Sequence, residues 1–226
     1  MKNQGNVEEF SYQSLLDMLT EEERKLFETA GREIELSKNE VLYREGNVSD
    51  RMFIVAEGRV KIGTYGDENK EVLKNLIHKG EIFGEGAVFG ESRRRDFAAA
   101  MDDTVIVLEL KAADVNAIMR NHPDISFKIT SQIAQKLHSA ERRLEALTFK
   151  NSRTRIIEFL KDTARKQGRK VGYETLLRPF LTHQDIGNLT TTSRQTVSSV
   201  LNELKGANQI YYDRHRLLIR DLSVLS

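Results

Sequence analysis

The chain has 226 residues, a formal net charge of +1 and no cysteine. This length allows two domains of ordinary size, each with its own hydrophobic core. The lack of cysteine excludes disulfides, thiol nucleophiles and cysteine-ligated iron–sulfur clusters. No apolar run has the length of a membrane span, and the first ten residues lack the basic and apolar regions of a signal peptide, so we expect a cytoplasmic protein.

The near-neutral total conceals an uneven distribution of charge. Residues 138–226 hold 16 Lys and Arg against 9 Asp and Glu, a net +7, whereas residues 1–137 carry a net −6. A basic C-terminal part beside an acidic N-terminal part is typical of a sensor domain joined to a nucleic-acid-binding domain. Two domains with ordinary solvated surfaces would give the same net charges, so charge alone does not decide between these two interpretations.

The N-terminal half carries helix signals followed by strand signals. Residues 14–30 predict one or two short helices, and Thr20 with Glu23 forms a capping box for the second. From Glu33 to Leu110 the pattern changes to short apolar runs that end at glycine. Several short strands at this spacing are typical of an antiparallel barrel or jelly roll rather than a parallel sheet.

A long helix is predicted from Pro123, since proline is tolerated in the first turn of a helix. Its apolar residues recur with the spacing of a heptad seam, at Ile133, Leu137, Ala140, Leu144 and Leu147. We expect this seam to pair with a second copy of the chain, and the alternative is a helix packed on its own barrel. The helix should break near residues 149–152, where Asn151 or Ser152 can open the next helix.

The most specific motif is the stretch 182–204, which predicts two short helices joined by a tight turn. Thr182 with Asp185 forms a capping box that opens the first helix, and Thr192 with Gln195 is predicted to open the second in the same way. Apolar residues with helical spacing predict one buried face of the second helix, at Val197, Val200, Leu201 and Leu204. A short strand pair is expected in residues 168–179, and strand-like runs around residues 213–215 predict a wing.

The opposite face of the second helix is polar, as a recognition helix in the major groove of DNA requires. The predicted DNA contacts are Thr182, Thr191, Thr192, Ser193, Arg194, Gln195, Ser198 and Ser199. Hydroxyls at the turn and the helix start suit phosphate contacts, whereas the fork of an arginine suits the O6 and N7 atoms of guanine. An ordinary solvated helix face is the alternative for these residues.

The chain resembles the CRP/FNR family of bacterial transcription regulators over residues 15–222. The resemblance is carried by the order of the predicted elements and by the motifs MFIVAEGRVKI, HKGEIFGE, NHPDISFKI and LTHQDIGNLTTTSRQTVSSVLNEL. It implies an α+β fold in three parts: an N-terminal antiparallel β jelly-roll barrel of the effector type with preceding helices (1–122), a dimerisation helix and hinge (123–150), and a C-terminal winged helix-turn-helix domain (151–226). It also implies a homodimer that binds a two-fold symmetric operator in double-stranded DNA, with RNA polymerase as a candidate partner.

The resemblance also implies a role for single residues of the second helix. Arg194 matches a position at which family members contact guanine. Gln195 stands where many members have Glu, and Ser199 stands where a second base-reading Arg is common. Because glutamine pairs better with adenine and glutamate accepts from cytosine, the half-site should differ from that of other members.

Cyclic-nucleotide-binding members of the family hold the phosphate with a Gly-Glu pair and a later Arg that Ser or Thr follows. Gly84 and Glu85 match the pair, and Arg95 matches the arginine, but Asp96 stands at the hydroxyl position. A carboxylate there repels a phosphate by about 1–4 kcal/mol at contact distance. The SRRRDF segment is therefore either a pocket for another anion or a solvated loop.

The long helix departs from the cyclic-AMP pattern as well. Ala140 and Glu141 stand where the cyclic-AMP members have an adenine-reading Thr-Ser pair, and neither can reproduce those hydrogen bonds. We therefore expect a regulator that cyclic AMP does not control, and the sequence identifies no other effector or cofactor.

The sequence contains no pattern of a catalytic or metal site. Metal-dependent enzymes on small barrels need clustered ligands, whereas the five histidines (78, 122, 138, 183 and 215) are isolated. Haem would need an axial ligand, and His78 lies in a predicted turn. No P-loop, Gly-x-Ser-x-Gly motif or cysteine nucleophile occurs, so we expect no enzyme. The alternative to a DNA-binding regulator is a ligand-binding barrel that acts through protein partners.

Overall fold

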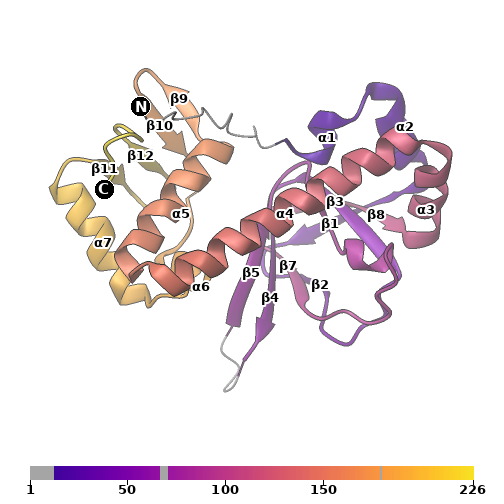
Figure 1. Cartoon of the computed structure of the whole chain (residues 1–226), viewed down its shortest axis with the longest axis horizontal. Coiled ribbons are helices and arrows are strands. Elements are labelled where there is room, and N and C mark those ends of the chain that lie inside the picture. The colour runs from indigo at the N-terminus through magenta and orange to yellow at the C-terminus, as the bar shows by residue number, and fades with distance from the viewer. Residues whose placement is uncertain (1–12, 67–70, 179) are drawn as a thin grey trace, which may run out of the picture.

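The computed structural model describes residues 13–66, 71–178 and 180–226. The start of the predicted first domain, residues 1–12, and Pro179 lie outside the described residues. Two lobes are joined by one long helix that crosses the molecule diagonally in Figure 1. Within the described ranges no helix is long and apolar enough to span a membrane.

Two short helices precede the barrel, as the capping signals predict. They are α1 (Leu15–Met18) and α2 (Glu21–Ala30). The Thr20 hydroxyl accepts a hydrogen bond from the Glu23 N–H, and the Glu23 carboxylate accepts one from the Thr20 N–H at 2.7 Å. The predicted capping box is confirmed, because each side chain satisfies a backbone donor that the helix leaves free.

The barrel is a jelly roll of two antiparallel sheets. Its strands are β1 (Arg32–Ser37), β2 (Val41–Tyr43), β3 (Arg51–Glu57), β4 (Val60–Tyr65), β5 (Glu71–Ile77), β6 (Ile82–Phe83), β7 (Phe97–Ala100) and β8 (Thr104–Lys111), with the 3-10 helix η2 (Glu85–Ala87) after β6. One sheet has the order β1-β8-β3-β6 and the other the order β2-β7-β4-β5. Side chains from both sheets meet in one core, which includes Phe53, Val55, Val60, Phe83 and Val107. The predicted jelly roll is confirmed.

Helices cover the outer face of the sheet that contains β3 and β8. The helix α3 spans Ala112–Asn121, and the long helix α4 spans Pro123–Phe149 with Pro123 in its first turn. Ile125 and Ile129 of α4 pack against Met52, Ile54 and Leu110 of the barrel. The first half of α4 is thereby fixed on its own domain.

One member of the predicted seam also packs on its own domain. Ile133 is half-buried against the same cluster that contains Ile129. The other four seam residues are exposed: Leu137, Ala140, Leu144 and Leu147. The apolar face is free only in the second half of α4, because the first half lies on the barrel.

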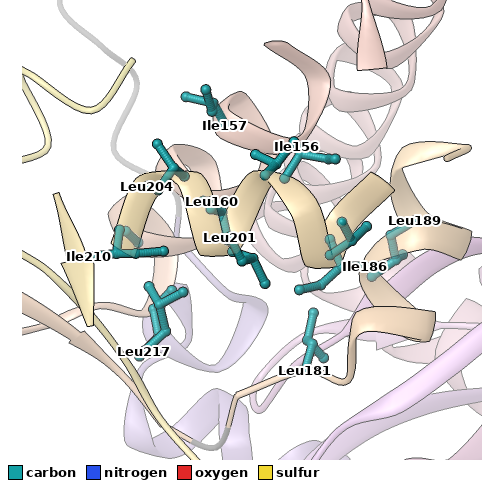
Figure 2. Close-up of a cluster of buried hydrophobic side chains, with 14 of the residues drawn as sticks. Ile156, Ile157, Leu160, Leu181, Ile186, Leu189, Leu201, Leu204, Ile210 and Leu217 are labelled. Atoms are coloured by element: carbon teal, nitrogen blue, oxygen red, sulfur yellow. The ribbon is translucent and has the colours of Figure 1, made fainter. Parts of the chain in front are cut away.

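The C-terminal lobe is a three-helix unit with a small antiparallel sheet. Its elements are α5 (Ser152–Gln167), β9 (Arg169–Val171), β10 (Glu174–Leu177), α6 (His183–Thr190), α7 (Arg194–Gly206), β11 (Ile210–Tyr212) and β12 (Leu217–Ile219). The predicted strand pair and wing are confirmed, and the sheet has the order β11-β12-β10-β9. Figure 2 shows buried side chains of the core that α5, α6 and α7 share, among them Ile156, Ile186 and Leu201.

The break between the lobes lies where the sequence predicts it. α4 ends at Phe149, and the Asn151 side chain caps α5 by accepting from the Thr154 N–H at 2.9 Å. The two lobes nevertheless share buried contacts, since Leu73 of β5 and Phe97 of β7 belong to the same cluster as the helices of the C-terminal lobe.

Candidate nucleic-acid interface and barrel interior

The first helix of the motif begins as the sequence predicts. The Thr182 hydroxyl accepts from the Asp185 N–H at 3.1 Å, and the Asp185 carboxylate accepts from the Thr182 N–H at 3.2 Å. This reciprocal pair confirms the capping box. The helix ends at Thr191, which has a left-handed backbone conformation with φ 54°.

The turn after α6 is tight and depends on a glycine. The Thr192 N–H donates to the Gly187 carbonyl at 2.9 Å. A Cβ atom on Gly187 would lie 2.9 Å from the Thr192 carbonyl oxygen, closer than ordinary packing allows. A side chain at residue 187 would therefore push the two helices apart.

The second helix begins one residue later than predicted. Ser193, not Thr192, is its N-cap residue, and the Ser193 hydroxyl accepts from the Thr196 N–H at 3.0 Å. The Thr192 hydroxyl instead lies 2.9 Å from the Thr190 hydroxyl. The predicted capping box of Thr192 and Gln195 is therefore wrong, because that hydroxyl is turned toward α6.

Seven of the eight predicted DNA-contact residues lie in the first half of α7 or in the turn before it, whereas Thr182 is the N-cap residue of α6. Those with exposed side chains are Thr182, Thr191, Ser193, Arg194, Gln195 and Ser199, while Thr192 and Ser198 are half-buried. The opposite face carries the buried apolar residues that the sequence predicts: Val197, Val200, Leu201 and Leu204. The polar face of α7 is thus presented outward with its N-terminus first, in the orientation that a recognition helix needs.

Two arginines that the sequence did not single out hold the C-terminus of α6. Arg155 of α5 donates from Nε to the Thr190 carbonyl and from a terminal nitrogen to the Thr191 carbonyl, both at 3.0 Å. Arg143 of α4 donates to the Leu189 carbonyl at 2.8 Å. The last carbonyls of a helix lack intrahelical partners and carry partial negative charge, so these guanidinium groups stabilise the turn. Their roles depend on tertiary contacts that sequence spacing does not give.

The wing adds positive charge beside the recognition helix. The Asp213 carboxylate accepts from the N–H groups of His215 and Arg216, which closes the hairpin tip. Arg214 and His215 are exposed at this tip. The side chains of Arg214 and His215 suit contacts with DNA phosphates. In the sequence, only the strand-like runs that predict a wing indicate these two residues.

An arginine also occupies the interior of the barrel beside Gly84. Arg94 is only 4% exposed, and its guanidinium donates to the Gly84 carbonyl at 3.0 Å and to the Arg51 carbonyl. It lies 4.4 Å above the ring centre of Tyr43, and the Tyr43 and Phe53 rings stack with their centres 5.9 Å apart. The left-handed Gly84 allows this approach, because a Cβ atom there would lie 2.8 Å from an Arg94 nitrogen.

The structure corrects which arginine faces Gly84. The predicted Arg95 points outward, with a side chain that is 85% exposed and whose Nε lies 3.8 Å from the Glu91 carboxylate. Asp96 is half-buried, 3.6 Å from the Lys74 ammonium, and burial raises the pKa of its carboxyl.

The other predicted pocket residues do not form one site. The Glu85 carboxylate lies 2.8 Å from the Lys136 ammonium of α4. Ala140 and Glu141 are exposed on α4, and the Glu141 carboxylate lies 3.6 Å from His138 Nδ1. Of the six predicted residues, Gly84, Glu85 and Asp96 are half-buried, whereas Arg95, Ala140 and Glu141 are exposed.

Both lobes match known domain families. Residues 33–122 match the cyclic nucleotide-binding domain, and residues 154–226 match the Crp-like helix-turn-helix domain. The cAMP-activated global transcriptional regulator CRP of Haemophilus influenzae is 26% identical over 170 residues, which are 75% of this chain and 75% of that protein. The Cyclic AMP receptor protein of Thermus thermophilus is 27% identical over 184 residues, which are 81% of this chain and 82% of that protein.

Solved structures share the whole arrangement. A CooA mutant from Carboxydothermus hydrogenoformans superposes with a TM-score of 0.77 at 27% identity and covers 94% of both chains. FixK2 from Bradyrhizobium japonicum gives a TM-score of 0.76 at 19% identity, with 86% of this chain and 95% of that one covered, and so supports the fold alone. With both domain types in this order and joined by α4, the chain belongs to the CRP/FNR family of DNA-binding transcription regulators.

Proposed function

We propose that this chain is a homodimeric regulator that reads a two-fold symmetric operator and that cyclic AMP does not control. The observation that carries the proposal is the outward polar face of α7, with Arg194 and Gln195 exposed in its first turn. Arg143 and Arg155 support it, because they fix the turn that sets the direction of this helix.

The dimer is supported by the apolar face of α4. Leu137 is 61% exposed and Leu144 is 66% exposed, one heptad apart on the same side of the helix. Two such faces pair as a coiled coil, in which each leucine is removed from water. A symmetric dimer presents two copies of α7 to major grooves about 34–36 Å apart, so its site consists of two inverted half-sites.

The half-site follows from the exposed side chains. Arg194 donates to the O6 and N7 atoms of a guanine, and Gln195 pairs with the N6 and N7 atoms of an adenine. Ser199 is too short to reach a base as an arginine does, so the base opposite it is specified weakly or through water.

Independence from cyclic AMP is supported by four features of the barrel and α4. Glu85 already pairs with Lys136, and the buried Arg94 already donates to backbone carbonyls, so neither is available without rearrangement. Asp96 adds a carboxylate where a phosphate would need a donor, and Ala140 offers no hydrogen bond to a base. The residues present do not fit this nucleotide, although the two curated relatives described above are named for it.

The test is selection of bound sequences from a random DNA pool without any cyclic nucleotide. We expect enrichment of an inverted repeat that contains a guanine in each half, with affinity that falls steeply as salt rises, because several phosphates are neutralised per dimer. RNA polymerase is then tested as a partner on the selected site. Absence of enrichment would favour a barrel that acts through protein partners instead.

A further inference from the structure

The exposed half of α4 carries charged residues on both flanks of its apolar seam. The four exposed seam residues occupy the a and d positions of two heptads. With Leu137 and Leu144 at the a positions, the residues directly before them stand at g. These are Lys136 and Arg143, and Glu141 stands at the first e position. Residues at e and g lie beside the seam of a coiled coil, where they can form ion pairs between the helices.

These charges favour a parallel pair of α4 helices over an antiparallel one. In a parallel pair each g position faces an e position of the other helix, so Lys136 faces Glu141 of the partner subunit. In an antiparallel pair each g position faces another g position, so the cations Lys136 and Arg143 would face cations. Because opposite charges attract and like charges repel, the pattern selects the parallel pair. Both C-terminal lobes then lie at the same end of the dimer.

The Lys136 ammonium can hold a second carboxylate. An ammonium has three N–H donors, and Lys136 donates to the Ile82 carbonyl at 2.7 Å and to the Glu85 carboxylate at 2.8 Å. Among the described residues these two groups are its acceptors, so one N–H remains for a further carboxylate. The Lys136 side chain is only 17% exposed, so an ion pair made there is screened less than one on the open surface.

The Glu141 carboxylate is weakly held within its own chain. Its side chain is 60% exposed, and its carboxylate lies 3.6 Å from His138 Nδ1. This distance is longer than an ordinary hydrogen bond between nitrogen and oxygen. A change of partner therefore breaks no strong contact of Glu141, and its main cost is the ordering of one side chain.

We propose that Glu141 of each chain pairs with Lys136 of the other chain, so that Glu85, Lys136 and the partner's Glu141 form a charge cluster that is complete only in the dimer. This ion pair fixes the parallel register of the two α4 helices. It also links the α4 helix of one chain to η2 of the other through Lys136. The inference rests on the proposed dimer and adds to it the residues that set its orientation.

A double-mutant cycle on the dissociation constant of the dimer tests the pair, with sedimentation equilibrium as the measurement. The variants are E141Q, K136Q and the two combined. We expect E141Q to weaken the dimer by about threefold to thirtyfold, because a symmetric dimer contains the pair twice. In the K136Q background, E141Q should change the dissociation constant by less than about twofold. E145Q neutralises an exposed glutamate away from the seam and should leave the dimer unchanged.

A charge reversal covers the case in which K136Q does not fold, since Lys136 also contacts its own barrel. E141K changes an exposed side chain and places two cations opposite each other across the seam. It should weaken the dimer more than E141Q does, and the difference should shrink as salt rises from about 0.1 M to about 1 M. E145K is the matched control and should weaken the dimer no more than E145Q does.

Single cysteines report the orientation of the helices, because the chain has no cysteine of its own. A140C and L147C both place the thiol at a d position, where equivalent residues of a parallel pair are close enough for a disulfide. We expect both variants to form disulfide-linked dimers on oxidation, whereas E145C should not. In an antiparallel pair, at most one of the two d positions can meet its own copy.

The outcomes separate the ion pair from the dimer. The proposal is overturned if E141Q and E141K leave the dimer unchanged, if the effects of E141Q and K136Q add, or if A140C and L147C do not both cross-link. A monomeric parent would overturn both this proposal and the proposed dimer. A dimer that cross-links as expected but does not respond to E141Q and E141K would overturn the ion pair and leave the proposed function standing.

Discussion

The Lys136 ammonium of α4 lies 2.8 Å from the Glu85 carboxylate and donates to the Ile82 carbonyl at 2.7 Å. Both charged side chains are largely buried, so the pair is screened less by water than a surface ion pair. It joins the long helix to η2, the segment at which the cyclic-nucleotide-binding family members place a phosphate. The position of α4 on the barrel is therefore set partly by residues of the chain itself.

Removal of this lysine should destabilise the chain. Lys136→Met leaves the Glu85 carboxylate without its cation and the Ile82 carbonyl without its donor, and we expect a loss of about 1–3 kcal/mol in the free energy of unfolding. Urea denaturation measures this loss. Lys38→Met breaks the exposed pair with Asp103 and should cost at most about 1 kcal/mol. Equal losses in the two variants would contradict the structural role of Lys136.

Gly187 before the turn and Gly206 at the end of α7 should respond to alanine in opposite ways. Gly187→Ala places a methyl group 2.9 Å from the Thr192 carbonyl and should cost about 1–3 kcal/mol through overpacking. The new methyl group of Gly206→Ala meets no atom within 4 Å. This variant should increase the free energy of unfolding by about 0.5–1 kcal/mol, because alanine favours a helix more than glycine does. Thermal melting distinguishes them. A Gly187→Ala variant as stable as the parent would show that the turn is looser than described.

Two glutamates should give opposite pH dependences of stability. Burial raises the pKa of the Glu81 carboxyl above its ordinary value of 4.5. Its contribution to the free energy of unfolding is therefore present below pH 4.5 and is lost as the pH rises from there through the raised pKa. Glu81→Gln should therefore gain stability relative to the parent as the pH rises from 4 toward neutrality. The Gln side chain can still accept from the His78 N–H, whose oxygen partner in the parent lies 2.9 Å away.

The Glu23 carboxyl has the opposite shift and serves as the comparison. A hydrogen bond from Lys128 and one from the Thr20 N–H lower its pKa, so its contribution is present above about pH 4.5 and is lost as the pH falls. The stability deficit of Glu23→Gln should shrink as the pH falls below 4.5. Urea titrations at pH 4, 5 and 7 measure both variants, and the same sign of change for both would contradict the assignment.

Arg194 should contribute specificity as well as affinity. Arg194→Ala should weaken binding to the selected site by about 1–3 kcal/mol per base contact and relax the preference at one position of each half-site. Arg194→Lys is the matched control, because it keeps the charge but loses the two-pronged donor. We expect the Arg194→Lys variant to retain the salt dependence of DNA binding but to lose the preference for guanine. A competition of oligonucleotides measures this preference. An unchanged preference in both variants would remove Arg194 from the interface.

The exposed leucines of α4 should hold the dimer together. The double variant Leu137→Glu/Leu144→Glu places two carboxylates on the α4 helix of each chain. Like charges would then face one another across the predicted seam of the dimer. Sedimentation equilibrium should then report monomers, with DNA affinity reduced accordingly. Val171→Glu with Val224→Glu changes two exposed apolar residues outside α4 and should leave the dimer intact. Dimers in the first variant would place the interface elsewhere.

Features set by neighbouring residues could be predicted from the sequence. The capping boxes at Thr20 and Thr182 use side chains three residues apart, and the buried face of α7 follows from helical spacing. The sequence predicts the start of α7 one residue too early, because Thr192 and Ser193 both carry a hydroxyl suited to capping. Only the turn conformation, with Thr191 left-handed, directs the first hydroxyl inward.

Features set by long-range contacts could not be predicted in this way. Three consecutive arginines precede Asp96, and the sequence does not show which one enters the barrel. That choice is made by the bridge between Val48 and Arg93 and by the hydrogen bond from the Arg94 N–H to the Asn47 carbonyl. The same limit applies to Ile133, whose burial depends on how α4 lies on the barrel.

Binding as a dimer without control by cyclic AMP is tested most directly by titration of the selected DNA site with the purified chain, with and without cyclic AMP, at fixed salt. Mass photometry of the same samples counts the chains per duplex. We expect two chains per duplex and the same Kd in both conditions, at a concentration typical of specific binding, about 10⁻⁸ M or below. Specific binding only when cyclic AMP is present, or one chain per duplex, would contradict it.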